Sequence, residues 1–147
     1  MRRDYEARRP KDAETPLFKA EKQLSIELRR KLCQEKCFPK RSQWMYGKPM
    51  SELLSDYRAS LSRANKPKIE YDGKIIPALR EERYIRQQLA MGDLDALDVL
   101  LNEAIEVLTL DPDKMENVLG LIHKNYVLLS AWIKADEKRY GPPVFGG

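Results

Sequence analysis

The sequence is poor in the residues on which most catalytic and metal sites depend. Its 147 residues include two cysteines and one histidine, and they contain no Gly-rich phosphate loop, HExxH or Gly-x-Ser-x-Gly motif. Cys33 and Cys37 are too few to close a zinc site, which takes four ligands, and helical i,i+4 spacing does not suit a disulfide. We expect both cysteines to pack as small apolar residues and His123 to be structural. The sequence therefore predicts no enzyme activity, metal, cofactor or small-molecule substrate.

Long hydrophobic runs are absent as well. The longest one, VLLSAWI near the end of the chain, is far shorter than the roughly 20 residues that cross a bilayer. The N-terminal stretch MRRDYEARRPKD has no apolar segment after its arginines, so it does not read as a signal peptide. We expect neither secretion nor a membrane span.

Amides and threonines are scarce, whereas charged residues are abundant. Asn and Gln number 9 and Thr only 2, against 40 Glu, Lys and Arg residues. Such a bias occurs where thermolabile amides are disfavoured and ion-pair networks add stability, so it indicates a thermophilic source.

Charge is distributed unevenly between the two halves of the chain. Residues 1–68 contain 18 Lys and Arg against 9 Asp and Glu, whereas residues 69–147 contain 9 against 14. This asymmetry predicts that one end of the protein meets a polyanion and the other does not. An ordinary mixed-charge surface is the alternative interpretation.

Prolines divide the chain into about five expected helices, with no convincing strand between them. The expected helices are Leu17 to Cys37, a second one after Pro49, Pro77 to Ala90, a fourth from Asp93 to Leu108, and Pro112 to Arg139. Gly92 is expected to close the third helix and Asp93 to cap the fourth. Residues 65–76 are expected to form a long loop that could act as a hinge.

Each expected helix has an apolar stripe at three-to-four spacing. The stripes of the first, second and last helices are Leu17, Ala20, Leu24, Leu28 and Leu32; Met50, Leu53, Leu54, Tyr57 and Leu61; and Met115, Val118, Leu119, Ile122, Tyr126, Leu129 and Ile133. The first stripe is narrow. We therefore predict an all-α fold: a C-terminal antiparallel four-helix bundle over residues 49–147, which the second helix completes, and a basic N-terminal helical extension over residues 1–48.

Cations and aromatic residues of the basic half are the candidate binding residues. The predicted set is Arg2, Arg3, Arg8, Arg9, Lys11, Lys22, Arg29, Arg30, Lys36, Lys40, Arg41, Trp44, Lys48, Arg58, Arg63, Lys66 and Lys68. Cations along an extended element can neutralise phosphates and release counterions without any base-specific contact. Trp44 and Tyr46 either stack on bases or sugars, or fold back over the bundle as a hydrophobic plug.

A sequence-specific DNA reader is not expected. LAMGDLDAL superficially resembles a helix-turn-helix turn, but the helix after it has five acidic residues that a phosphate-lined groove would repel. The sequence contains no RNP motif, KH loop or zinc finger.

The order of these segments resembles the major coat proteins of filamentous archaeal viruses, of the lipothrixvirus and rudivirus type. The arm MRRDYEARRPK comes first, Pro-punctuated basic helices extend to about Lys68, and the bundle extends to about Tyr140. The resemblance implies that the extension wraps double-stranded DNA held in A-form and that the bundle forms the outer wall of a helical filament in the virion. It also implies that subunits pair as homodimers or with a related coat chain, with Trp132, Val144 and Phe145 at subunit contacts.

Two other functions stay open at this point. One is a cytoplasmic nucleic-acid-binding module, associated with ribosomes or chromatin, that uses the same basic residues without polymerising. The other is an adaptor whose basic half binds an acidic protein partner.

Overall fold

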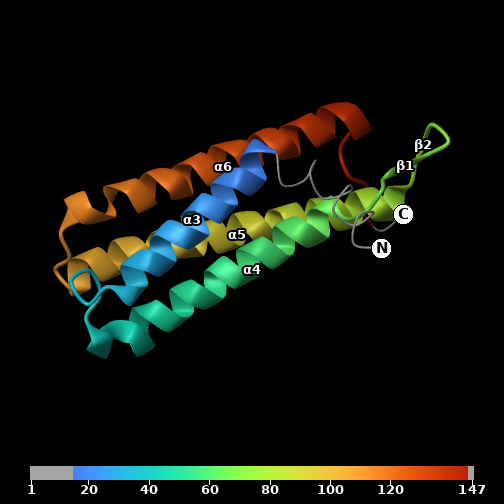
Figure 1. Cartoon of the computed structure of the whole chain (residues 1–147). Helices are drawn as coiled ribbons and strands as arrows, with labels where there is room; N and C mark the ends of the chain where they lie inside the picture. Colours follow the sequence, from blue (N-terminus) through green and yellow to red (C-terminus); the bar gives the residue numbers. More distant parts are fainter. Residues whose placement is uncertain (1–14, 146–147) are drawn as a thin grey trace, which may run out of the picture.

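The computed structural model describes residues 15–145, and the fold of this part is mainly helical (Figure 1). Its long helices are α3 (Pro16–Cys33), α4 (Lys48–Asn65), α5 (Pro77–Val107) and α6 (Pro112–Tyr140). A 3-10 helix, η1 (Lys40–Ser42), and a π-helix, η2 (Gln43–Gly47), connect α3 to α4, and a small hairpin of β1 (Glu70–Tyr71) and β2 (Lys74–Ile75) precedes α5. The all-α prediction is confirmed. Within residues 15–145, no helix has the length and apolar character that a membrane span requires.

Prolines begin the helices, as the sequence predicted, and polar side chains cap two of them. Each of the four long helices has a proline in its first two positions, where the missing N–H costs no intrahelical hydrogen bond. Thr15 caps α3 by accepting a hydrogen bond from the Phe18 N–H at 3.4 Å, and Asp111 caps α6 by accepting one from the Asp113 N–H at 3.0 Å.

The third and fourth expected helices are one continuous helix, so the predicted break at Gly92 is wrong. α5 passes through Gly92 and Asp93 without interruption, and Gly92 does not adopt a positive φ. The buried stripe continues across this point through Ala90, Leu94 and Leu97, and its packing outweighs the propensity cost of one glycine. The first helix, conversely, ends at Cys33 rather than at Cys37.

Replacing Gly92 by alanine is expected to raise the free energy of unfolding by about 1 kcal/mol, because alanine loses less backbone entropy inside a helix. A Cβ atom at Gly92 would meet nothing within 4 Å. Chemical denaturation of Gly92→Ala measures the gain. Gly73→Ala is the matched control: its surroundings are equally open, but its φ is +74°, so this variant should be less stable than the wild type. A loss at Gly92 would contradict the prediction.

The segment expected to be a long loop contains a hairpin, so the expectation of no strand is also wrong. β1 pairs antiparallel with β2, with Glu70 opposite Ile75 and Tyr71 opposite Lys74. Asp72 and Gly73 connect the strands with φ values of 50° and 74°. Asp-Gly is a preferred sequence for turns in which both central residues have positive φ, and this local preference closes the hairpin.

One hydrophobic core extends through α3, α4, α5 and α6, which lie side by side (Figure 1). α4 packs most extensively on α5, α3 packs on α6, and α5 packs on α6. The predicted stripe of α3 is entirely buried, from Leu17 to Leu32. Although α3 lies within the expected extension of residues 1–48, its apolar face thus belongs to the same core as residues 49–147.

A polar residue takes one of the core positions predicted for α6. Tyr126 is 44% exposed, contrary to the prediction, and Asn125 is fully buried. The Asn125 side-chain amide donates to the Ala20 carbonyl at 2.9 Å and to the Leu121 carbonyl at 2.8 Å, while its oxygen accepts from the Tyr57 hydroxyl at 2.7 Å. Because every polar group is paired, Asn125 can join α3, α4 and α6 inside the core.

Asp93, which was expected to cap a helix, lies half-buried in the middle of α5. Burial raises its pKa above the ordinary value of 3.8, the Asp56 carboxylate raises it further, and a hydrogen bond from the Ser60 hydroxyl at 3.5 Å opposes the rise. Above that ordinary value, the unfolded chain loses its proton first, so ionisation of Asp93 lowers folded-state stability as the pH rises.

Asp93→Asn is therefore expected to be more stable than the wild type near neutral pH, with the difference disappearing below the ordinary pKa of 3.8. Denaturation across a pH series measures this. Asp95→Asn makes the same charge change at an exposed position of α5 and should show a smaller gain. A gain at Asp93 that does not depend on pH would contradict the assigned cause.

Candidate nucleic-acid interface

Arg29, one of the predicted binding residues, connects α3 to α4. Its Nε donates to the Ser25 hydroxyl at 3.1 Å, and its Nη2 donates to the Ser55 hydroxyl at 3.1 Å and the Ser51 carbonyl at 3.4 Å. The Arg29 side chain is half-buried. Because its donors are engaged with α4, Arg29 holds the two helices together. Its half-buried charge still adds to the positive potential of this side of the molecule.

Arg58 makes the second connection between these helices. Its Nε and Nη2 donate to the two carboxylate oxygens of Glu21 at 2.9 and 3.1 Å, a bidentate pair. The Glu21 side chain is 8% exposed, whereas the Arg58 side chain is 51% exposed. The hydrogen bond from Arg58 to Glu21 raises the pKa of Arg58 above its ordinary value. Arg58 thus neutralises a carboxylate that α3 would otherwise bury alone.

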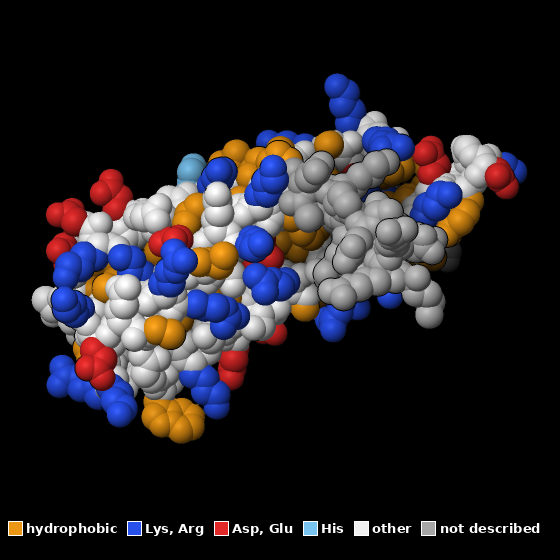
Figure 2. Space-filling model, in the orientation of Figure 1, with side chains coloured by type: hydrophobic (Ala, Val, Ile, Leu, Met, Phe, Trp, Pro, Cys, Tyr) orange, Lys and Arg blue, Asp and Glu red, His pale blue; other side chains and the backbone are white. Residues whose placement is uncertain are grey.

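The other predicted cations of α3, of α4 and of the residues that flank these helices are exposed. Lys22, Lys36, Lys40, Arg41, Arg63 and Lys66 are exposed and form no ion pair within residues 15–145. Arg30 is also exposed and pairs with Glu27 at 3.1 Å. Figure 2 shows Lys and Arg side chains spread over this face of the molecule, with fewer acidic side chains between them. The term "basic face" refers below to the exposed cations of α3, α4 and the segment that connects them.

The connection from α3 to α4 folds against the core. Phe38 is fully buried, and Cys37 is 4% exposed. Gln43 Nε2 donates to the Leu32 carbonyl at 2.9 Å, which ties η2 to the end of α3. Cys33 is exposed, so the expectation that both cysteines are buried holds for Cys37 alone. The reason is that α3 ends at Cys33, and the two thiols no longer share a helix face.

The two aromatic residues of this connection have different environments. Tyr46 is 2% exposed, and its hydroxyl donates to the Glu103 carboxylate at 3.0 Å, as a plug over the core would. Trp44 is 80% exposed, and the Lys48 ammonium lies 4.8 Å from the centroid of its ring. Of the two alternatives left open by the sequence, Tyr46 therefore packs over the core, whereas Trp44 does not. Trp44 presents a ring face next to cations, the combination that binds single-stranded bases by stacking.

The basic face extends along the whole of α4. Lys48 begins this 18-residue helix, which is about 27 Å long at 1.5 Å per residue, and Lys66 follows its end. Beyond it, the Lys68 ammonium lies 5.1 Å from the centroid of the Tyr71 ring. A surface of this length spans several phosphates of a nucleic-acid backbone.

Five residues of the predicted site lie outside the described residues, and the prediction omitted two lysines of α3. Arg2, Arg3, Arg8, Arg9 and Lys11 lie outside the described residues. Lys19 is exposed and Lys31 is half-buried on α3, and the prediction omitted both. Lys19 lies one helical turn before Lys22, and Lys31 directly follows Arg30, so the neighbouring predicted cations of the same helix could have indicated both.

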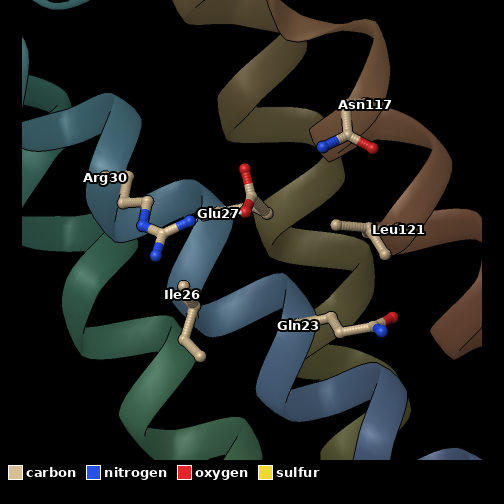
Figure 3. Close-up of a pocket in the computed structure, with 6 residues that line it drawn as sticks. All are labelled: Gln23, Ile26, Glu27, Arg30, Asn117 and Leu121. Atoms are coloured by element: carbon tan, nitrogen blue, oxygen red, sulfur yellow. Dashed lines mark hydrogen bonds and ion pairs between the residues drawn. The ribbon is translucent and has the colours of Figure 1, made fainter.

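A shallow hollow of about 440 Å³ lies between α3 and α6 (Figure 3). It is lined by Gln23, Ile26, Glu27, Arg30, Asn117 and Leu121. Glu27 offsets the charge of Arg30 in this lining. The hollow is therefore a poor anion site compared with the basic face beside it.

Other chemistry-bearing residues stand apart from one another. Within residues 15–145, no group of three or more His, Cys, Asp and Glu side chains is arranged to hold a metal ion. His123, expected to be structural, is exposed on α6. Comparisons of the chain with protein-family models, with curated proteins and with solved structures found no match.

Proposed function

We propose that this protein is a structural nucleoprotein that binds double-stranded DNA through sequence-independent phosphate contacts. The observation that carries the proposal is the basic face: exposed cations extend over the length of α3 and α4, with the exposed Trp44 at one end. α5 is acidic by contrast, with Asp95, Asp98 and Glu106 exposed. A polyanion would approach such a protein from the side of α3 and α4.

The proposed mechanism is electrostatic. Lysines and arginines that neutralise phosphates release condensed counterions, and this release supplies most of the affinity of non-specific binding. Trp44 adds a stacking surface where bases or sugars are accessible. Because the apolar stripe of α3 is buried in the core, α3 contributes a docking face, and wrapping around the duplex is assigned to the arm with Arg2, Arg3, Arg8, Arg9 and Lys11.

We also infer that α3, α4, α5 and α6 form an antiparallel four-helix bundle. The contacts between α3 and α4 support this: Glu21, early in α3, meets Arg58, late in α4, whereas Arg29, late in α3, meets Ser51, early in α4. The sequence predicted four bundle helices within residues 49–147, but two of them are the single helix α5. In this arrangement α3 is therefore the fourth helix of the bundle.

We further propose that the protein is a viral coat protein that polymerises into a helical filament with the DNA, pairing with a second copy or with a related chain. Its role in the virion would be structural rather than catalytic. Val144 and Phe145, expected at subunit contacts, are 64% and 53% exposed, which leaves them accessible to a neighbour. Trp132 is half-buried instead, with the Arg83 guanidinium 5.7 Å from its ring.

The test is binding of the purified protein to random-sequence duplex DNA across a salt series, with electron microscopy of the same mixtures. Steep salt dependence together with regular filaments is the expected result. Tight binding without filaments would replace the coat function with that of a cellular nucleic-acid-binding module. An absence of binding at low salt would overturn both functions and leave an adaptor for an acidic protein.

A further inference from the structure

Three arginine side chains lie near the ring of Tyr140. Tyr140 ends α6 at the end of the molecule where the hairpin lies (Figure 1). The guanidinium carbons of Arg80, Arg83 and Arg139 are 6.0, 5.8 and 5.2 Å from the centroid of the Tyr140 ring. Arg80 and Arg83 lie on the same face of α5, three residues apart, and Tyr140 ends α6. The cluster is distinct from the basic face and belongs to the half of the chain whose net charge is negative.

Two of these arginines have carboxylate partners. Arg83 Nη1 donates to both carboxylate oxygens of Asp136, at 3.3 and 3.4 Å, and Asp136 is 5% exposed. Arg139 pairs with Glu70 at 3.5 Å, where both side chains are exposed. The charges of Arg83 and Arg139 are therefore balanced.

Arg80 has no carboxylate partner within residues 15–145, although it is only 3% exposed. Its Nε and Nη2 donate to a single neutral acceptor, the Gly141 carbonyl, at 3.4 and 3.1 Å. The third nitrogen, Nη1, is buried without a hydrogen-bond partner. The rings of Tyr84 and Tyr140, each about 6 Å away, offset only part of the charge. The hydrogen bonding and charge pairing of Arg80 are therefore incomplete, and burying a charge is costly unless it is paired.

We propose that Arg80 forms the base of an anion site that takes a phosphate group, and that the segment after α6, residues 141–145, is its cover. A guanidinium presents donors in a planar fork that matches two phosphate oxygens, and a charged oxygen is a stronger acceptor than a backbone carbonyl. Arg83 Nε, which is also buried without a partner, provides a second donor on the adjacent turn of α5.

The cover is held by few contacts. The Gly141 carbonyl accepts from Arg80, and the Gly141 N–H donates to the Glu137 carbonyl of α6 at 2.8 Å. The rings of Phe145 and Tyr84 have centroids 5.8 Å apart. The Gly141 carbonyl belongs to the next peptide unit, so it can turn away from Arg80 while the N–H keeps its bond to α6. Val144 and Phe145 are largely exposed, so lifting the segment removes little apolar surface from the core. A phosphate group can therefore replace the Gly141 carbonyl on Arg80 without disturbing the four long helices.

The phosphate group comes either from inorganic phosphate or from the end of a nucleic-acid strand. The internal phosphates of a duplex cannot reach a buried nitrogen, because the rest of the duplex backbone continues on both sides of them. Inorganic phosphate alone tests the site. Short duplexes with and without a 5′-phosphate, compared in competition with inorganic phosphate, distinguish the two sources. The first measurement does not depend on DNA binding by the basic face, so the two proposals fail separately.

The experiment compares thermal unfolding in phosphate and in chloride at equal ionic strength. At about 10 mM phosphate the melting temperature of the wild-type protein should rise by about 3 °C or more over chloride, the shift expected for a ligand that binds only the folded state with a Kd of about 1 mM. Arg80→Met should lose this shift and, in chloride, melt at or above the wild-type temperature, because the unpaired buried charge is gone. Arg86→Met removes a half-buried arginine of the same helix and should keep the shift.

Tryptophan fluorescence gives a second readout at the site itself. In a Trp44→Phe background the signal comes from Trp132, beside Arg83, and it should change on addition of phosphate and not of chloride. Equal effects of phosphate and chloride on the wild-type protein would overturn the proposal even if Arg80→Met does not fold. Retention of the phosphate shift in Arg80→Met would overturn it too. A lower melting temperature for Arg80→Met in chloride, with no phosphate effect in the wild type, would make Arg80 a latch for the cover only.

Discussion

Asp136→Ala is expected to lower the free energy of unfolding by about 3 to 5 kcal/mol, the range for breaking a buried ion pair from one side. Asp136 accepts from Arg83 Nη1 and, at 2.9 Å, from Gln87 Nε2, and the side chains of Arg83 and Asp136 are 13% and 7% exposed. Without the carboxylate, a guanidinium and an amide are left buried. The charge cannot move to solvent, because Arg83 is also held by the Pro67 carbonyl at 3.2 Å.

Urea denaturation of Asp136→Ala and of Glu137→Ala tests this expectation. Glu137 is the exposed neighbour of Asp136 on α6, so its replacement makes the same charge change without burial and should alter stability by less than about 1 kcal/mol. Equal effects of the two substitutions would show that the pair contributes nothing beyond surface charge. Asp136→Ala also removes the carboxylate that pairs with Arg83. If the anion site at Arg80 exists, phosphate should stabilise this variant more than it stabilises the wild type.

Replacing four cations of the basic face by glutamine is expected to weaken DNA binding and to flatten its dependence on salt. The variant combines Lys22→Gln, Lys40→Gln, Arg41→Gln and Arg63→Gln, all at exposed positions. Each lost phosphate contact lowers the slope of log K against log salt by about 0.9, so the slope should fall by about 3 to 4 if all four contact the backbone. Fluorescence anisotropy with labelled random duplex across a salt series measures the slope.

A matched control on α6 separates a binding face from net charge. Lys114, Lys124, Lys134 and Lys138 are exposed, and their replacement by glutamine makes the same change in net charge. This control should keep most of the wild-type slope, because α6 lies outside the basic face. Equal losses in the two variants would mean that binding follows overall charge, and the assignment of α3 and α4 as the interface would then be wrong.

The parts of the fold that the sequence predicted correctly depend on local patterns. Prolines and caps begin helices through their own backbone chemistry, and the stripe from Leu17 to Leu32 repeats at helical spacing whatever packs against it. Gly92 misled the prediction because a glycine closes a helix only when the chain can turn there, and the core of α5 continues past it. The choice of Asn125 over Tyr126 for the core depends on hydrogen-bond partners from α3 and α4.

For the candidate site too, some features follow from the local sequence and others only from the packing of the helices. The sequence alone determined that the cations lie in the first half of the chain, that the protein is all-α, and where most helices begin. Only the tertiary structure decided that Arg29 and Arg58 are engaged between helices, that Tyr46 is buried while Trp44 is exposed, and that Arg80 approaches Gly141. Arg80 and Gly141 are far apart in the sequence, and no local pattern encodes a contact between them. Whether a charged side chain is free to bind a partner depends on which groups the fold brings within hydrogen-bonding distance, and that is a property of the packed helices.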